Sequence, residues 1–449
     1  MKQKFNFTKD KISYLLKKIA IPAATGTLFQ SLYTLVDTFY AGKISTNALV
    51  SLSKAFPIAF LIIAFGVGVS AGSTSLIANS LGEKNNKKAS SYVAQSIIYS
   101  ILIAAFVIFI GLTYADNLLQ VMGTEKENII LTLQYTDIIF IGSIFFFLQV
   151  SLNSSLNAQG DTKSYRNILI ISFFLNILLN PLFIFGVGFI PAFGISGLAI
   201  ATIISQLVSL IYILLKVLRT KLVKKITMKF FSIKINFILD LFKQGAPITI
   251  SLILIGVGIY NILFFVSKFG DIAAAGYGVA LRIEQLLLLP TIGLNTAVLS
   301  ITAQNFGAKE YKRIGEVYFK AINYGACLMV LAGIFIFFGG HWMVQLFTDD
   351  PDVINFGIKY LKIAALIGPV YPIFFITNAF FQGIKKPIYS TYINLLRIVV
   401  LPFVTMWVML NYFEGDFEDL FLGLLIINWI FGISVLMLVK YVFLKKLTN

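Results

Sequence analysis

The sequence is poor in charge, cysteine and histidine. Only 12% of its 449 residues are charged and 58% are hydrophobic, whereas water-soluble domains carry about 25% charged residues. The single cysteine, Cys327, lies in an apolar run, so no disulfide framework or cysteine-based metal site can form and a packing role is expected. The single histidine, His341, stands beside Trp342 near an expected helix end and is expected to be interfacial. A soluble fold is excluded.

Motifs for nucleotide binding and catalysis are also missing. The sequence has no phosphate-binding glycine loop, no HExxH and no nucleophile elbow. We therefore expect neither an enzyme nor an ATP-driven pump, and no cofactor. The net charge of +16 does not indicate nucleic acid, because basic loops on the cytoplasmic side give membrane proteins positive charge.

Long apolar runs make up most of the chain. A membrane-spanning helix needs about 20 apolar residues, and the runs predict twelve such helices. They cover 14–39, 50–81, 88–113, 130–158, 165–188, 193–219, 237–268, 277–307, 315–346, 357–383, 388–411 and 420–444. The sequence therefore predicts an all-α polytopic membrane protein embedded in a lipid bilayer.

Basic and acidic residues separate into alternate connections. Lysine and arginine dominate the N-terminus, 84–88, 163–166, 216–234, 309–313, 385–386 and the C-terminus. Acidic residues mark 116–127, 349–352 and 414–419. The basic side of a membrane protein is cytoplasmic, so we expect both termini and a linker at 220–236 to lie there, in the cytoplasmic (plasma) membrane.

The two halves of the chain repeat. Pro22 in "KKIAIPAATGTLFQSL" aligns with Pro247 in "FKQGAPITISLILIGV", and "SLIANSLGEKNNKKA" aligns with "SITAQNFGAKEYKRI" at the same offset of 225 residues. Six helices per repeat give both halves the same orientation. We expect two parallel six-helix lobes, 14–219 and 237–444, related by a pseudo-twofold axis along the membrane normal. This architecture is typical of secondary transporters with a substrate site between the lobes.

A few polar residues interrupt the apolar helices of the first half. Asp37 shares a helix face with Tyr33 and, more loosely, Gln30; its counterpart in the repeat is Ile262, so the fold does not demand a carboxylate there. The alternative is a helix-end cap near the next loop. Asn176 and Asn180 lie one turn apart, and could equally be helix-packing contacts.

Other candidate positions are spread over both halves. Glu284, in "LRIEQLL", is a candidate functional carboxylate, and a structural ion pair with Arg397 is the alternative. Further candidates for lining a substrate chamber are Asn153, Asn157 and Asn378. The 43 Phe and 20 Tyr suit a chamber that binds flat cations, although lipid-facing phenylalanine is the plainer explanation.

Several segments resemble the multidrug and toxin extrusion (MATE) family. They are "IPAATGTLFQSLYTLVDTFYAGKISTNALVSL", "AQGDTKSY", "NILLNPLFIFG", "GISGLAIATIISQ" and "GYGVALRIEQLLLLPTIGLNTAVLSITAQNFGA". Their order matches the family, and the similarity extends from about residue 14 to 440. Asn378 stands where some branches carry an acid, which favours the DinF-like branch.

The resemblance implies a cation site in the N-terminal lobe. The family's pattern maps onto Asp37, Asn176, Asn180 and Thr202. Many members have a second carboxylate where this chain has Asn180, so the cluster holds a cation such as Na⁺ less strongly and lacks a repelling carboxylate pair. Both H⁺ and Na⁺ stay open as the coupling ion, with a slight preference for H⁺. Family behaviour also suggests that the first helix bends at Pro22.

The resemblance further implies an antiporter, and we expect the chain to act as a monomer. We expect it to export amphiphilic organic cations or drugs in exchange for H⁺ or Na⁺ by alternating access. The alternative is a flippase for lipid-linked precursors or polysaccharides from the same superfamily. That function would more naturally come with fourteen helices and basic residues within the cavity.

Overall fold

The chain is helical throughout in the computed structural model, which describes residues 5–223 and 228–448. The α-helices are α1 (Ile12–Ile44), α2 (Thr46–Gly82), α3 (Asn86–Val121), α4 (Lys126–Ala158), α5 (Lys163–Phe185), α6 (Ile195–Leu218), α7 (Ile235–Val266), α8 (Asp271–Leu287), α9 (Leu289–Gly307), α10 (Tyr311–Gln345), α11 (Pro351–Ile367), α12 (Tyr371–Gly383), α13 (Ile388–Asn394), α14 (Leu401–Asn411), α15 (Phe417–Met437) and α16 (Lys445–Thr448). Short 3-10 segments are η1 (Met228–Phe231), η2 (Ser267–Phe269) and η3 (Gly368–Val370), and π-helical segments are η4 (Leu395–Val400) and η5 (Leu438–Leu444).

These helices give the twelve spans that the apolar runs predict. Among the residues that the structure describes, eleven helices are long and apolar enough to cross a membrane, and α8 with α9 makes a twelfth when the bent pair counts as one. Consecutive segments such as α11, η3 and α12 form a single span. Of the basic residues that the charge pattern uses, Lys2, Lys4, Lys224 and Lys225 lie outside the described residues.

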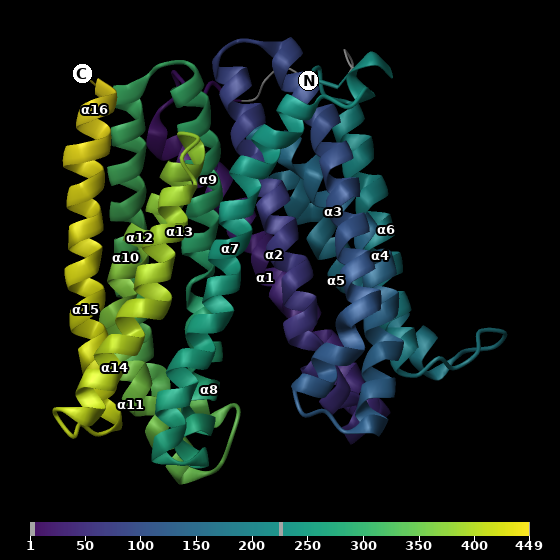
Figure 1. Ribbon diagram of the computed structural model, residues 1–449, viewed down its shortest axis with the longest axis vertical. Helices are drawn as coiled ribbons and strands as arrows, with labels where there is room; N and C mark the ends of the chain where they lie inside the picture. The colour runs from purple at the N-terminus through teal and green to yellow at the C-terminus, as the bar shows by residue number, and fades with distance from the viewer. Residues whose placement is uncertain (1–4, 224–227, 449) are drawn as a thin grey trace. The chain divides into compact units, whose positions relative to one another are not determined.

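The chain divides into two compact units. Unit 1 contains Thr25–Thr249, and unit 2 contains Asn6–Ala24 together with Ile250–Asn449. Helices α1 and α7 therefore each begin in one unit and end in the other (Figure 1). The lobe boundaries expected at 14–219 and 237–444 stay a prediction.

Helix α4 is central to unit 1, because it packs against α2, α3 and α6. The connection between α6 and α7 is fixed on α3 of the same unit. The Gln95 side chain donates to the carbonyls of Phe230 and Ser232, both at 2.8 Å, and accepts from the Lys234 N–H at 3.0 Å. The end of this connection is thereby held against the bundle and sets where α7 begins.

The repeat is visible in how helices end. Helix α2 ends at Gly82 and α9 at Gly307; the residues two positions later, Lys84 and Lys309, both have positive φ, 57° and 61°. The Asn85 N–H bonds the Ser80 carbonyl at 3.0 Å, and the equivalent pair 225 residues later, Glu310 and Asn305, bonds at 2.9 Å. The aligned sequence segments therefore build the same turn.

One predicted helix departs from the repeat. The stretch 277–307 is expected to be one helix, but the helix breaks at Leu288 and the chain bends by 43° between α8 and α9. Pro290 in the first turn of α9 cannot donate a backbone hydrogen bond, and its ring crowds the preceding turn. Helix α2 continues through its own Pro57, so proline alone does not determine where a span breaks.

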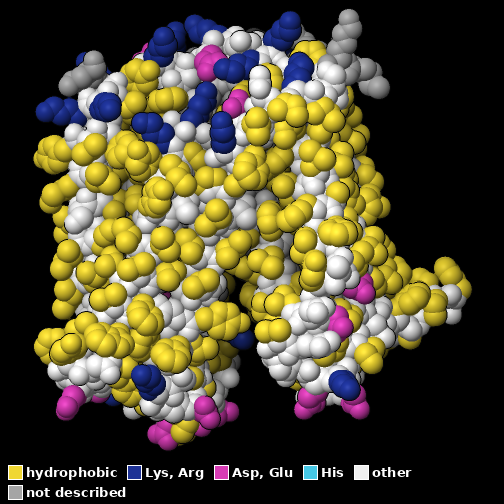
Figure 2. All heavy atoms as spheres, viewed as in Figure 1, with side chains coloured by type: hydrophobic (Ala, Val, Ile, Leu, Met, Phe, Trp, Pro, Cys, Tyr) yellow, Lys and Arg dark blue, Asp and Glu magenta, His cyan; other side chains and the backbone are white. Residues whose placement is uncertain are grey.

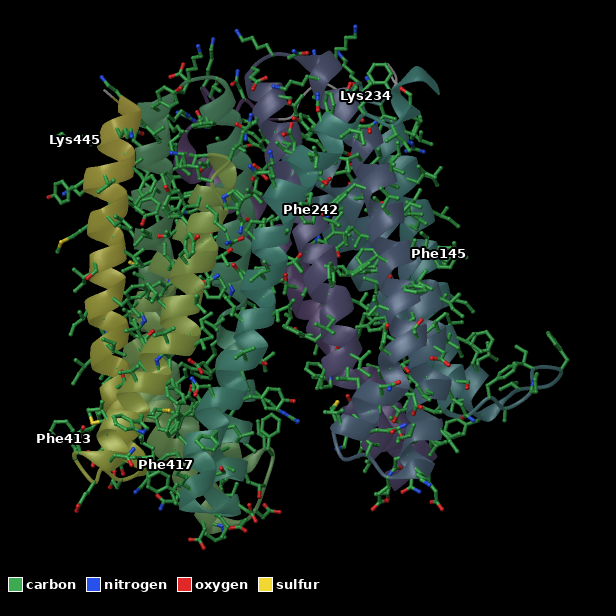
Figure 3. All side chains as sticks on the ribbon, in the orientation of Figure 1. Phe145, Lys234, Phe242, Phe413, Phe417 and Lys445 are labelled. Carbon is green, nitrogen blue, oxygen red and sulfur yellow. The ribbon has the colours of Figure 1, made fainter. Side chains whose placement is uncertain are left out.

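The two ends of each unit differ in charge. Figure 2 shows most lysine and arginine side chains at one end of each unit, most acidic side chains at the other, and apolar side chains between. In unit 2, Lys445 and Phe413 mark these two ends (Figure 3).

The start of α10 lies beside the C-terminal segment, because a Cβ on Gly315 would sit 3.7 Å from Leu444. The same region binds the N-terminal segment through Arg313 and the carbonyls of Phe7 and Asp10.

The lone cysteine and histidine lie on α10. The expected packing role of Cys327 is wrong, because its side chain is exposed on a helix whose neighbouring Leu328 and Leu331 are also exposed. An apolar run that spans a bilayer can place a cysteine on the lipid face as readily as in the core. His341 and Trp342 are both exposed near the end of α10, in keeping with an interfacial position.

A short hairpin joins α5 to α6. Helix α5 ends at Phe185, three residues before the predicted end at 188, and Val187 and Ile190 then form an isolated bridge. The tip residue Phe189 is 95% exposed, and the hairpin projects sideways from the helices of unit 1 (Figure 1).

Candidate functional site

Three helices of unit 1 bring four predicted residues together inside the span. Asp37 lies on α1, Asn176 and Asn180 on α5, and Thr202 on α6. The side-chain amides of both asparagines donate to Asp37 Oδ1 at 3.0 Å, and the Thr202 hydroxyl is 3.4 Å from Asp37 Oδ2. The asparagines also bond each other, with Asn180 Nδ2 3.1 Å from Asn176 Oδ1.

The cluster is enclosed by protein. Asp37 is 7% exposed and both asparagines are fully buried. Asp37 lies well inside α1, which continues to Ile44, so it does not cap that helix. A charge at this depth is costly unless side chains or water stabilise it, and here several side-chain donors do so. These four residues are the strongest candidate site in unit 1.

The site has neighbours beyond the predicted four. The Tyr33 hydroxyl is buried and has no hydrogen-bond partner in the described part of the chain, although Asn176, Thr202 and Ser205 lie close to it. Tyr135 on α4 interacts electrostatically with Asp37. Ser205 could have been found from its position three residues after Thr202, on the same helix face; no pattern in the sequence points to Tyr135.

Other predicted residues lie apart from this cluster. Gln30 is exposed on α1. Asn153 is buried on α4, with a side-chain oxygen that lacks a partner among the described residues, and Asn157 is half-buried one turn later. Neither shares a hydrogen bond with Asp37 within the part of the chain that the structure covers. Their expected role in lining a substrate chamber stays a prediction.

The donor pattern around Asp37 bears on what the site could hold. Both amide nitrogens face Asp37 Oδ1, and the two amide oxygens are turned toward each other's nitrogen. Na⁺ would need the amide oxygens to face inward beside the carboxylate, since only oxygens can coordinate it. The residues can supply such oxygens by rotating their amides, but in this arrangement they stabilise a carboxylate directly. Among residues 5–223 and 228–448, no three His, Cys, Asp or Glu side chains gather as a metal site.

A second buried carboxylate lies in unit 2. Glu284 is on the last turn of α8, and Tyr360 of α11 donates to its Oε2 at 2.5 Å. Its Oε1 has no partner in the described residues. The guanidinium of Arg397, carried on the π-helical segment η4, stacks over the rings of Tyr371 and Phe374 at 4.7 and 4.3 Å.

The predicted ion pair between Glu284 and Arg397 does not form as a direct contact. The described residues contain three salt bridges, and none joins these two, although each influences the other electrostatically. Asn378 bonds Asn394 at 3.3 Å and does not join Glu284.

Pro22 lies inside α1, which continues as a helix through it. The helix passes from unit 2 to unit 1 between Ala24 and Thr25, two residues later. The predicted hinge thus stands at the point where α1 changes units.

Comparison with known proteins identifies the family. The sequence model of the MatE family matches residues 22–182 and 247–408. A probable multidrug resistance protein of Bacillus subtilis, YoeA, is 27% identical over 364 residues, covering 79% of this chain and 78% of its own. The FAD transporter of Shewanella oneidensis is 25% identical over 438 residues, covering 97% and 96%. The multidrug export protein MepA of Staphylococcus aureus is 26% identical, covering 80% and 79%.

Solved structures share the fold. An outward-facing multidrug resistance MATE transporter of the MOP superfamily superposes with a TM-score of 0.92 at 23% identity, covering 99% of this chain and 98% of its own. A MOP superfamily transporter from Pyrococcus furiosus gives the same score and identity over 99% and 98%. The resemblance read from the sequence is thereby confirmed, and the chain belongs to the MatE family of multi-pass membrane transporters.

Proposed function

We propose that this chain is a proton-coupled antiporter that exports amphiphilic organic cations or drugs, with Asp37 as the proton-binding group. The observation that carries the proposal is the enclosed carboxylate of Asp37, held by side chains from two other helices within the span. In the membrane, an ionisable residue in such a position marks an ion or proton pathway by default.

The hydrogen bonds support a proton over Na⁺. Asp37 Oδ1 accepts from two amides, whereas Oδ2 has only the 3.4 Å contact with the Thr202 hydroxyl. A proton on Oδ2 can be accommodated if this hydroxyl turns from donor to acceptor, with no movement of the asparagines. Na⁺ coordination by the two amide oxygens requires both amides to rotate, and the hydrogen bonds that the amides make with Asp37 would then be lost.

Coupling requires that the proton favours one conformation. A bound ion shifts the equilibrium between two states only by the difference in its affinity for them. A hundredfold difference in proton affinity, about 2.7 kcal/mol, changes the ratio of the two conformations a hundredfold. Helices α1, α5 and α6 meet at Asp37, so protonation would alter the contacts that fix α1 within unit 1.

Export also needs a defined orientation and substrate class. We infer that the basic end of each unit is cytoplasmic, in a cytoplasmic membrane, and that the chain acts as a monomer. The relatives named for multidrug resistance and export support lipophilic organic substrates. The twelve candidate spans favour this function over a flippase for lipid-linked precursors.

Transport by purified protein in vesicles tests the proposal. A pH gradient should drive accumulation of a cationic dye such as ethidium, and a Na⁺ gradient alone should not. Asp37→Asn should reduce driven transport by about tenfold or more while equilibrium dye binding stays nearly unchanged. Asp137→Asn is the matched control and should transport normally, because Asp137 is a half-buried residue of α4 outside the cluster. Driving by Na⁺ alone would overturn the ion assignment, and full activity of Asp37→Asn would make Glu284 the candidate.

A further inference from the structure

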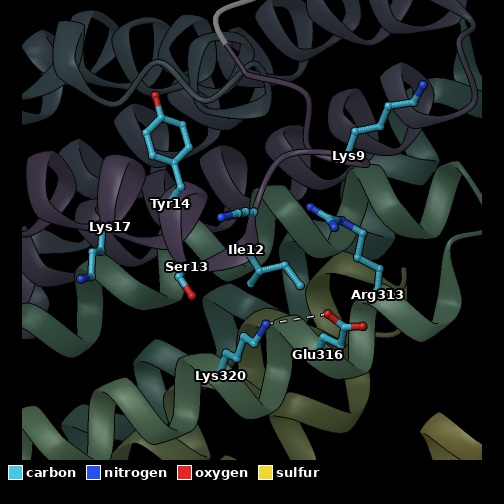
Figure 4. Close-up of a pocket in the computed structure, with 9 residues that line it drawn as sticks. Lys9, Ile12, Ser13, Tyr14, Lys17, Arg313, Glu316 and Lys320 are labelled. Carbon is cyan, nitrogen blue, oxygen red and sulfur yellow. Dashed lines mark ion pairs between the residues drawn. The ribbon is translucent and has the colours of Figure 1, made fainter.

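We propose that unit 2 carries a binding site for the phosphate headgroup of an anionic phospholipid, in a pocket between the N-terminal segment and α10. The pocket has a volume of about 560 Å³ and is separate from both buried carboxylates. Lys9, Lys11 and Lys17 line it from the N-terminal side, and Arg313 and Lys320 line it from α10 (Figure 4).

The N-terminal segment is fixed to α10, so the pocket has two defined walls. Arg313 donates to the carbonyl of Phe7 at 3.0 Å and to the carbonyl of Asp10. Asn305 at the end of α9 donates to the same Phe7 carbonyl at 3.1 Å, and the Phe7 side chain is buried. Arg313 thus positions the segment that presents the lysines.

The charges of the pocket are unbalanced. Five basic side chains line it and Glu316 is the one acid; Lys320 lies 3.9 Å from Glu316 and offsets it. Within the described part of the chain, no salt bridge involves Lys9, Lys11 or Lys17. The Asp10 carboxylate nearby accepts from the Asn6 N–H at 2.8 Å. Lys9, Lys11 and Lys17 therefore line a pocket whose one lining acid, Glu316, already has a basic partner, and this excess of positive charge suits a phosphate.

One face of α10 leads from the pocket-lining Lys320 to exposed apolar residues, and this favours a lipid over a free anion. Lys320, Tyr324, Leu328 and Leu331 recur at helical spacing on one face of α10. Leu328 and Leu331 are 42% and 64% exposed, and Lys17 lies 6.0 Å above the Tyr324 ring. A headgroup bound among the lysines could extend its acyl chains along this stripe. Basic pockets beside membrane-spanning helices bind anionic headgroups in this way.

Native mass spectrometry of the full chain in detergent tests the site. The protein is titrated with phosphatidylglycerol, with phosphatidylcholine, and with inorganic phosphate. We expect retention of phosphatidylglycerol over phosphatidylcholine. The triple variant Lys9→Gln, Lys11→Gln, Lys17→Gln should bind phosphatidylglycerol about a hundredfold more weakly, if each lysine contributes as basic residues at anionic surfaces do.

A matched control removes three charges elsewhere in unit 2. Lys309→Gln, Lys312→Gln, Lys446→Gln are exposed positions outside the pocket and should leave binding unchanged. The single variant Lys11→Gln gives a smaller loss in the same direction and guards against a folding defect in the triple. Equal binding by the pocket and control triples, or no preference of the wild type for phosphatidylglycerol, would overturn the proposal. Displacement of the lipid by millimolar inorganic phosphate would show a free-anion site and overturn the lipid assignment.

Discussion

Pro22 and Pro247 lie 225 residues apart, and each stands two residues before the point where its helix passes from one compact unit to the other. The boundaries fall between Ala24 and Thr25 in α1 and between Thr249 and Ile250 in α7. A proline inside a helix removes one backbone hydrogen bond and weakens the helix locally. Helices α1 and α7 therefore each have a weak point at the same place in the repeat.

This relationship predicts that both prolines matter for conformational exchange. Pro22→Ala and Pro247→Ala restore the missing N–H, so bending at the unit boundaries should become harder and dye efflux should slow by about tenfold. Dye affinity at equilibrium should be preserved. Pro57→Ala, inside α2 and within one unit, is the control and should transport at the wild-type rate. Equal rates for all three variants would contradict a hinge role.

A second prediction concerns the missing carboxylate. Asn180 Nδ2 lies 3.0 Å from Asp37 Oδ1, so Asn180→Asp places two carboxylates together, and they repel unless a cation or proton lies between them. The variant should bind Na⁺, and Na⁺ at about a hundred times its dissociation constant should stabilise it by about 2.7 kcal/mol. Melting in NaCl and in choline chloride measures this. Asn180→Ala should show no Na⁺ effect, and a wild type stabilised as strongly as Asn180→Asp would speak against proton coupling.

The turn after α5 provides a stability prediction. Gly186 has φ of 74°, and a Cβ there would lie 2.7 Å from the Ile190 carbonyl oxygen, whereas Gly188 has φ of 62° and open space around it. Both alanine variants place a side chain on a residue with positive φ, which strains the backbone, but only Gly186→Ala also brings the new Cβ into a clash. We expect Gly186→Ala to lower the free energy of unfolding by about 1–3 kcal/mol more than Gly188→Ala. Equal melting temperatures would show that the hairpin relaxes freely.

Sequence reasoning was most effective where short-range chemistry determines structure. Gly82 and Gly307 end their helices as the aligned segments predict, because the turn that follows requires the same local backbone. The contact of Asp37 with Asn176 and Asn180 was predictable only from the family resemblance, because periodicity within one helix does not show which helices pack together. The break at Leu288 was not predictable from proline content, since α2 tolerates Pro57.

The sequence could not define the rest of the site. Tyr135 on α4 is close enough to Asp37 to interact electrostatically, and this proximity depends on how the helices pack, which residue spacing does not reveal. Gln30 lies seven residues before Asp37 on nearly the same face of α1, yet its side chain is exposed. Seven residues correspond to about 10 Å along the helix axis, so a residue on the same face can lie beyond the buried cluster. The packing role predicted for Cys327 is wrong for a related reason, because an apolar run does not show whether a side chain faces the protein core or the lipid.

Under the proposed function, protonation of Asp37 changes how α1 is held in unit 1. The distance between spin labels at positions 43 and 130, near the end of α1 and the start of α4, can be measured by electron paramagnetic resonance. The labels are placed in a Cys327→Ser background, because the native cysteine is exposed. We predict that the distance between the two labels changes between acidic and neutral pH in this background and stays constant when Asp37→Asn is added. The same pH-dependent distances with and without Asp37→Asn would contradict it.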